Sequence, residues 1–153
     1  YLRWLFGEFA AIWGFSGKIS DLEITVDDIA EIGLQLANGM VGTVHLDYYR
    51  RPAGNDLEVT GTDGVLHWDN ASGVVTIHKN SEPEVQEFAP PAGFERNWLF
   101  LAETRHFIDV TSGQAEPSCT LADGVIAEQM VAGLRCSWIE KRILSFDEVS
   151  AIE

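Results

Sequence analysis

Three side chains capable of acid–base or metal chemistry fall at strand spacing in the first third of the chain. His45 and Asp47 are two positions apart, which puts them on the same face of a β-strand. Glu31 lies opposite His45 if the hairpin has the register argued below. Such a group could hold a metal ion or transfer a proton. We prefer the alternative, a polar cross-strand network that stabilises the sheet, because such networks are common.

The other histidines give weaker patterns. Glu103 and His106 have the i, i+3 spacing of half a carboxylate-bridged two-metal site, but the second Glu-x-x-His is absent, so a solvated helix face is preferred. His67 and His78 have no carboxylate or cysteine at ligand spacing, which favours strand packing. Neither a Gly-x-Gly-x-x-Gly nor a Gly-x-Ser-x-Gly motif occurs. We therefore predict no metal site and no nucleotide site in this chain.

The elements that would position these residues begin with a hairpin. Two runs of alternating apolar and polar residues flank an Asn-Gly pair. A three-residue loop ending in a left-handed Gly39 pairs Leu36 with Met40 and Ile32 with Val44, which keeps the aliphatic residues on one face. The opposite face is half polar, as expected for contact with water, a ligand or a partner subunit.

Periodicity predicts strands in the first two thirds of the chain and helices in the last third. We expect an α+β fold: an open, predominantly antiparallel sheet with helices packed on one face and the other face free for oligomerisation. The expected elements are a helix end at 1–6, strands at 9–16, 28–49 (the hairpin), 56–60, 65–68, 74–78 and 85–88, helices from 95 to 112 and from 121 to 139, and a strand at 143–146.

Composition excludes several classes of function. The chain has 153 residues and a formal net charge of −14, which argues against nucleic-acid binding because its basic residues cluster only in pairs. Its apolar stretches are too short to span a membrane. Cys119 and Cys136 lack Cys-x-x-Cys spacing, so we expect two buried, reduced thiols and a cytoplasmic location.

Three segments together resemble one family. They are VDDIAEIGLQLANGMVGTVHLDYYRRP (26–52), LEVTGTDGVLHWDNASG (57–73) and FERNWLFLAETRHFIDVTSGQAEPSCTLADG (94–124). Their order and motifs resemble the C-terminal domain of the Gfo/Idh/MocA oxidoreductases, the family of glucose–fructose oxidoreductase and inositol dehydrogenase. Phe107 and Gly113 match that family's "hF…G" pattern.

The resemblance implies that residues 1–153 are the substrate and oligomerisation domain of a dehydrogenase acting on a sugar, a polyol or a related derivative. The parent would use NAD or NADP, bound by an N-terminal dinucleotide-binding domain that is this chain's first partner. A homo-oligomer would form through the sheet. The family's catalytic residues would precede Tyr1, so no catalytic or cofactor-binding residue is assigned here, and we expect no activity from this chain alone.

Substrate contacts are the remaining contribution that the resemblance implies. Tyr49, Arg50 and Arg51 follow the hairpin, where family members use sheet edges and loops to hold a small-molecule substrate, and arginine pairs well with acids. A solvated strand end is the alternative for these three. For the whole chain, the alternative is a stand-alone binding or scaffold module without redox chemistry.

Overall fold

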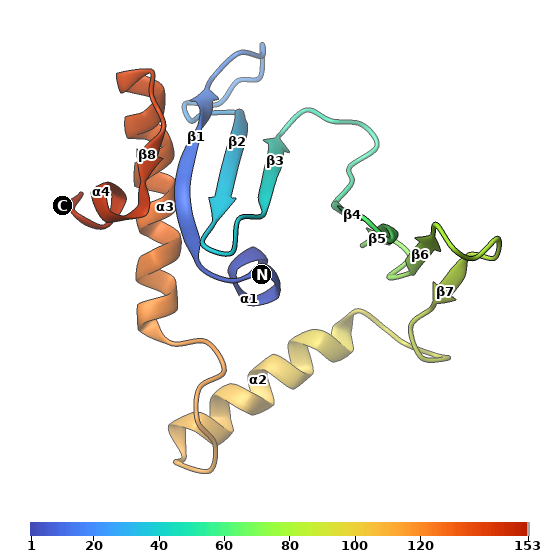
Figure 1. The fold of residues 1–153 in the computed structure, drawn as a ribbon. Helices are drawn as coiled ribbons and strands as arrows, with labels where there is room; N and C mark the ends of the chain where they lie inside the picture. Colours follow the sequence, from blue (N-terminus) through green and yellow to red (C-terminus); the bar gives the residue numbers. More distant parts are fainter. Residues whose placement is uncertain (153) are drawn as a thin grey trace. The chain divides into compact units, whose positions relative to one another are not determined.

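The computed structural model describes residues 1–152, and it has the α+β class predicted from the sequence. Figure 1 shows the order of helices and strands along the chain. The elements are α1 (Leu2–Phe6), β1 (Phe9–Gly17), β2 (Ile29–Leu36), β3 (Val41–Asp47), β4 (Asp56–Gly61), β5 (Gly64–Asp69), β6 (Val75–Lys79), β7 (Gln86–Phe88), α2 (Asn97–Thr111), α3 (Leu121–Glu140), β8 (Leu144–Ser145) and α4 (Phe146–Ser150).

Within these residues the strands form two four-stranded sheets, where a single sheet was expected. Their orders are β3-β2-β1-β8 and β4-β5-β6-β7, and neighbouring strands are antiparallel throughout. The chain accordingly divides into two compact units. The first unit comprises residues 1–49 and 118–153, and the second comprises residues 50–117.

The hairpin β2–β3 has the predicted register. Ile32 pairs with Val44 and Glu31 with His45. Gly39 has a φ of 90°, a left-handed conformation that costs glycine little, and the Leu36 amide donates to the Met40 carbonyl at 2.9 Å. The alternation of aliphatic and polar residues therefore does set which face of this sheet packs inward.

Helix α3 covers one face of the first sheet, where it lies beside β1 (Figure 1). Gly133 permits close approach of α4, because a Cβ there would lie 2.7 Å from Cγ2 of Val149. The buried hydrophobic cluster between sheet and helices consists of Ile12, Leu34, Met130, Leu134, Leu144 and Val149. Ile32 and Val44 pack against it, so the opposite face of the hairpin is the open face of this sheet.

Capping boxes define the starts of α3 and α4. The Thr120 amide and hydroxyl donate to the Asp123 carboxylate at 2.7 and 2.6 Å, while the Asp123 amide donates to Thr120 Oγ1. Ser145 and Glu148 repeat this arrangement at α4. Arg3 also pairs with Asp123, which ties α1 to the start of α3. Sequence reasoning located α3 and β8 but did not identify α4.

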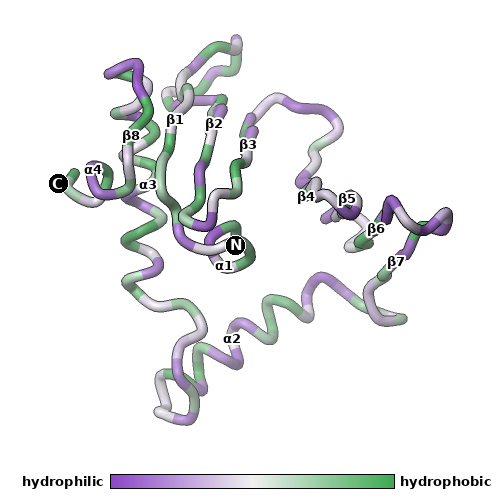
Figure 2. Tube along the Cα trace, viewed as in Figure 1, coloured by the Kyte–Doolittle hydropathy of each residue, from purple (hydrophilic) through white to green (hydrophobic). Residues whose placement is uncertain are grey.

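The second unit holds the other sheet and α2. Strand pairing aligns Leu57, Trp68 and Val75 on one face of this sheet, and Glu58, His67 and Thr76 on the other. No residue of α2 is buried in the described chain, although its periodicity predicted a packed stripe. Residues 98–101 are four consecutive apolar residues, and four consecutive side chains of a helix are spread over a full turn, not along one face. Figure 2 shows hydrophobic and hydrophilic positions mixed along α2.

Two further sequence expectations bear on the chain as a whole. No helix within residues 1–152 is long and apolar enough to cross a membrane. Both cysteines are free; Cys136 is partly buried, but Cys119 is exposed, so the expectation of a buried thiol is wrong there. Cys119 lies two residues before α3 and is not among the residues of the core cluster.

Candidate functional site

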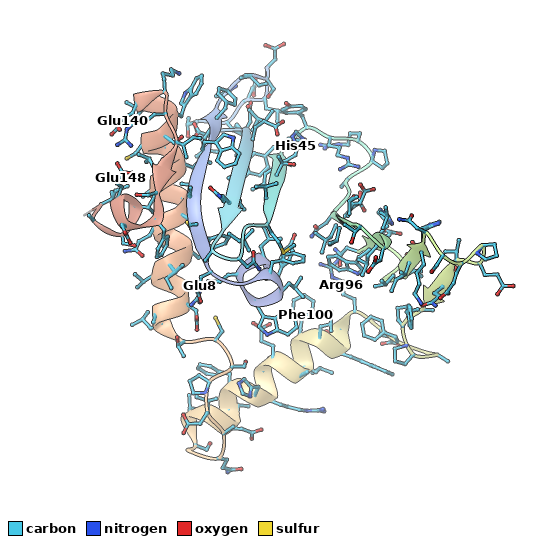
Figure 3. The ribbon with its side chains drawn as sticks, viewed as in Figure 1. Glu8, His45, Arg96, Phe100, Glu140 and Glu148 are labelled. Carbon is cyan, nitrogen blue, oxygen red and sulfur yellow. The ribbon has the colours of Figure 1, made fainter. Side chains whose placement is uncertain are left out.

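The open face of the first sheet carries an imidazole between two carboxylates. Glu31 on β2 and His45 on β3 are directly paired, and the Nδ1 of His45 lies 2.6 Å from Oε1 of Glu31. The Nε2 of His45 lies 2.7 Å from Oδ2 of Asp47, two residues along the same strand. Figure 3 shows His45 on β3. The strand alternation that buries Ile32 and Val44 is what brings these three side chains together.

The two carboxylates raise the pKa of His45 above its ordinary value of 6.5. The hydrogen bond with Glu31 contributes most, followed by the one with Asp47, and both outweigh the opposing effect of burial. The three members differ in exposure: the side chain of Glu31 is 51% exposed and that of His45 45%, whereas that of Asp47 is only 4% exposed. Asp47 is thus the fixed end of the cluster and Glu31 the solvated end.

Asp47 connects this cluster to Tyr49. Its second carboxylate oxygen, Oδ1, accepts a hydrogen bond of 2.9 Å from the Tyr49 amide, which closes a turn directly after β3. Burial raises the pKa of the Tyr49 hydroxyl, and the nearby charges of Asp47, Asp28 and Glu31 raise it further. Tyr49 is therefore held neutral, as a hydrogen-bonding phenol, beside an acidic group of side chains.

Asp28 anchors the loop that leads into β2, a role the sequence did not reveal. The residue is 1% exposed, and its carboxylate accepts hydrogen bonds from the Ile19 amide at 2.8 Å, the Ser20 amide at 3.0 Å and the Ser20 hydroxyl at 2.5 Å. Burial acts to raise the pKa of Asp28, but these bonds and Lys18 at 3.9 Å lower it overall. The Asp28 carbonyl also accepts from the Tyr48 amide, so the anchor reaches the turn after β3.

Trp13 covers the middle of the same open face. It pairs with Gly33 across β1 and β2, and a Cβ built on Gly33 would fall on the indole atoms of Trp13. Gly33 is buried beneath that ring, two residue pairs along the hairpin from Glu31 and His45. A glycine in the middle of an alternating strand, opposite a tryptophan, is the sequence signal that could have located this contact.

The predicted substrate contacts are consecutive residues at the sequence boundary between the two units. Tyr49 is the last residue of the first unit, and Arg50 and Arg51 begin the second. The Nη2 of Arg50 lies 3.5 Å from Oδ2 of Asp56, and its guanidinium packs 3.2 Å from the position of a Cβ on Gly54. Arg51 donates from Nη1 to the Arg50 carbonyl at 2.7 Å. The hydrogen bond from its amide to Asp47 joins Tyr49 to the Glu31–His45–Asp47 cluster.

The remaining histidine patterns belong to the second unit. Glu103 and His106 are exposed or nearly so on α2, and His67 and His78 lie on β5 and β6 of the second sheet. In the part of the chain that the structure describes, no group of three or more histidine, cysteine, aspartate or glutamate residues has the arrangement needed to hold a metal ion.

Comparison with protein families gives one match. Residues 1–67 match the model of the GFO/IDH/MocA C-terminal domain, and these residues include the hairpin and the Glu31–His45–Asp47 cluster. A search of curated proteins finds no match to this chain.

Solved structures extend the likeness to nearly the whole chain. Levoglucosan dehydrogenase in complex with NADH and levoglucosan matches 94% of this chain, with a TM-score of 0.81 and 18% identity. An oxidoreductase from Agrobacterium radiobacter in complex with NAD+, L-tartaric acid and magnesium matches 96%, with a TM-score of 0.76 and 19% identity. An NAD binding oxidoreductase from Klebsiella pneumoniae matches 94%, with a TM-score of 0.79 and 13% identity.

At these identities the solved structures establish a shared fold. The chain spans 46% of the levoglucosan dehydrogenase and Agrobacterium chains and 47% of the Klebsiella chain. The resemblance inferred from the sequence is confirmed: this chain is similar to the C-terminal domain of the Gfo/Idh/MocA oxidoreductases by family match over residues 1–67, and it shares its fold over nearly its whole length with the oxidoreductases named above.

Proposed function

We propose that the chain is the substrate-shaping and subunit-contacting domain of an NAD- or NADP-dependent oxidoreductase that acts on a sugar, a polyol or a related derivative. The observation that carries this proposal is the agreement between the family match at residues 1–67 and the fold match over at least 94% of the chain. The proteins matched by fold are named as oxidoreductases and are about twice as long. Residues 1–153 would then be one domain of a two-domain enzyme.

We place the dinucleotide outside this chain. The positive end of a long helix is the usual seat for a pyrophosphate, but the start of α3 already holds the Asp123 carboxylate, bonded to Thr120 and to Arg3. The glycine-rich turn between strand and helix that a dinucleotide needs does not occur in the sequence. These residues do not fit the cofactor, so we assign hydride transfer and its catalytic groups to the partner domain.

The contribution of this chain is to hold the substrate. Tyr49 offers a neutral hydroxyl, because the surrounding carboxylates and burial raise its pKa. Arg50 and Arg51 add positive charge to a chain with a net charge of −14, which suits a substrate carrying carboxylate or acidic hydroxyl groups. We also propose self-association through the open face of the first sheet, where Trp13 supplies apolar area and Glu31 and His45 supply polar contacts.

The decisive experiment uses the complete enzyme encoded around this chain. We expect reduction of NAD or NADP in the presence of a sugar, polyol or sugar acid, followed by the absorbance of the reduced nicotinamide. Arg51→Gln should raise KM for the best substrate by about 10-fold, the equivalent of roughly 1.4 kcal/mol, with a smaller change in kcat. A complete gene product without a dinucleotide-binding domain would refute the hypothesis that the protein is an NAD- or NADP-dependent oxidoreductase.

The chain by itself supplies the control. Titrated with NADH or NADPH, residues 1–153 should give no saturable change in nicotinamide fluorescence. Saturable micromolar binding would contradict the placement of the cofactor on the partner domain. Lys79→Gln, which removes the same charge from a residue of β6, is the matched variant for Arg51→Gln and should leave KM unchanged.

A further inference from the structure

We propose that Glu31, His45 and Asp47 form a protonation-dependent support that positions Tyr49 for the substrate. His45 and Asp47 act as positioning residues, through the turn that Asp47 closes on the Tyr49 amide. The proposal rests on the proposed function in one respect, that Tyr49 contacts substrate. The coupling between His45 and Tyr49 can be tested without that assumption.

The geometry fits a doubly protonated His45. Both ring nitrogens face carboxylate oxygens, at 2.6 Å from Glu31 and 2.7 Å from Asp47. An ionised carboxylate can only accept hydrogen bonds, and a neutral imidazole has only one N–H to donate. With neutral His45, one nitrogen lone pair would face a carboxylate oxygen at contact distance. The observed arrangement therefore belongs to the imidazolium, in agreement with the raised pKa of His45.

Exposure decides which contact breaks when the proton leaves. Glu31 is half exposed and can turn into water, whereas the Asp47 side chain is 4% exposed and is also held by the Tyr49 amide. Neutral His45 should thus keep its N–H on Asp47 and release Glu31. The bond to Asp47 then loses its positively charged donor and keeps only the charge of the carboxylate, so the electrostatic attraction across it is weaker. The turn that holds Tyr49 is weaker in that state.

The charges of Glu31 and Asp47 both raise the pKa of His45. Glu31 reaches it from β2 and Asp47 from its own strand β3, and these are the two charges that shift its pKa. Asp28, at the start of the hairpin, acts on Tyr49 and is itself paired with Lys18. Helix α3 covers the other face of the sheet and so does not neutralise this cluster. Loss of the His45 proton leaves two carboxylates without their shared cation.

The direct test is a pH titration of the 153-residue chain by NMR. We expect the Tyr49 amide nitrogen and the His45 ring proton on Cε1 to follow one-proton curves with the same midpoint, above 6.5. His45→Gln keeps an N–H donor for Asp47 but cannot titrate, so the Tyr49 step should disappear. Glu31→Gln should lower the midpoint of both curves together. A Tyr49 step that is absent from the wild type, or that survives His45→Gln, overturns the proposal.

Two variants complete the design. Asp47→Asn removes the carboxylate that links the two residues, so His45 should still titrate while the Tyr49 step is lost; an unchanged Tyr49 step would contradict the coupling. His78→Gln removes a histidine of the second sheet and should leave the Tyr49 curve as in the wild type. A Tyr49 step that vanishes with His78→Gln would place its origin outside the cluster and overturn the assignment.

The complete enzyme separates this proposal from the proposed function. KM should rise as the pH passes the His45 midpoint, with kcat less affected, and His45→Gln should remove that step. If Tyr49→Phe raises KM but the pH step persists in His45→Gln, the support is refuted and the substrate role of Tyr49 stands. If Tyr49→Phe leaves KM unchanged, the substrate role fails, whatever coupling the NMR titration gives.

Discussion

The contact between Trp13 and Gly33 offers the sharpest test of the open face. A Cβ on Gly33 would overlap the indole atoms Cε2, Nε1 and Cζ2 of Trp13, whereas a Cβ on Gly42 in the neighbouring strand would meet nothing within 4 Å. Carbon atoms settle about 3.5–4.0 Å apart, so Gly33→Ala must displace the ring by more than about 1 Å. Gly42→Ala demands no movement at all.

The free energies of unfolding should therefore change in opposite directions. Overpacking of this kind costs about 1–3 kcal/mol, so Gly33→Ala should destabilise the first unit by that amount. Gly42→Ala should stabilise it by about 0.5–1 kcal/mol, because alanine loses less backbone entropy than glycine in a strand. With a urea dependence of about 1–3 kcal/mol per molar, the two midpoints should differ by roughly 0.5 M or more.

Urea denaturation followed by tryptophan fluorescence and far-UV circular dichroism measures both variants. A double-mutant cycle assigns the cost to the ring: in a Trp13→Ala background, Gly33→Ala should no longer destabilise. The reasoning is refuted if Gly33→Ala is no more harmful than Gly42→Ala, or if its cost is the same with and without the indole of Trp13.

Three further outcomes follow from the packing and the helix starts. Leu134→Ala in the core should lower the free energy of unfolding by about 2–5 kcal/mol. Leu121→Ala, on the same helix but at a residue that is 86% exposed, should change it by less than about 0.5 kcal/mol. Equal urea midpoints for the two variants would contradict the assigned core. Thr120→Ala should cost about 0.5–2 kcal/mol through loss of the α3 capping box, with a matching fall in Tm. The pKa of Asp123 is lowered from 3.8 to about 2 by its bonds to Thr120 and Arg3, and that of Glu148 from 4.5 to about 2 by Ser145 and Arg142. Because both pKa values are lower in the folded protein than in the unfolded chain, the two ionised carboxylates stabilise the folded state above pH 4.5. This contribution is lost as the pH falls toward 2, so Tm should drop across this window. The drop should be less steep in the double variant Asp123→Asn/Glu148→Gln.

The hairpin could be predicted because the residues that set its register are close together in the sequence. An Asn-Gly pair and two alternating runs allow few registers, and only one keeps Ile32 and Val44 on the same face. That register also places Glu31 opposite His45, so it predicts the polar cross-strand network that the hydrogen bond between these two residues forms. The structure adds the hydrogen-bond distances and the unequal exposure of the two carboxylates.

The features that could not be predicted from the sequence depend on contacts between residues that are distant in the sequence, except for one helix whose capping motif was not used. The role of Asp28 follows from amides eight and nine residues earlier in the chain, which no strand or helix period reveals. The exposure of α2 depends on where the second unit's elements lie, and apolar residues alone do not encode that. Helix α4 had a readable signal, the Ser-x-x-Glu capping box at Ser145 and Glu148, beside the strand that was predicted there.

Self-association and the charge on His45 must be linked if a partner subunit covers the open face. With neutral His45 the three side chains would carry two negative charges shielded from water, whereas the imidazolium leaves only one excess negative charge among them. Covering the face should thus favour the proton, and by linkage protonation should favour association. The midpoint of His45 should then rise with protein concentration, in step with the mass measured by light scattering. If oligomers form while the midpoint stays constant, the open face is not their interface.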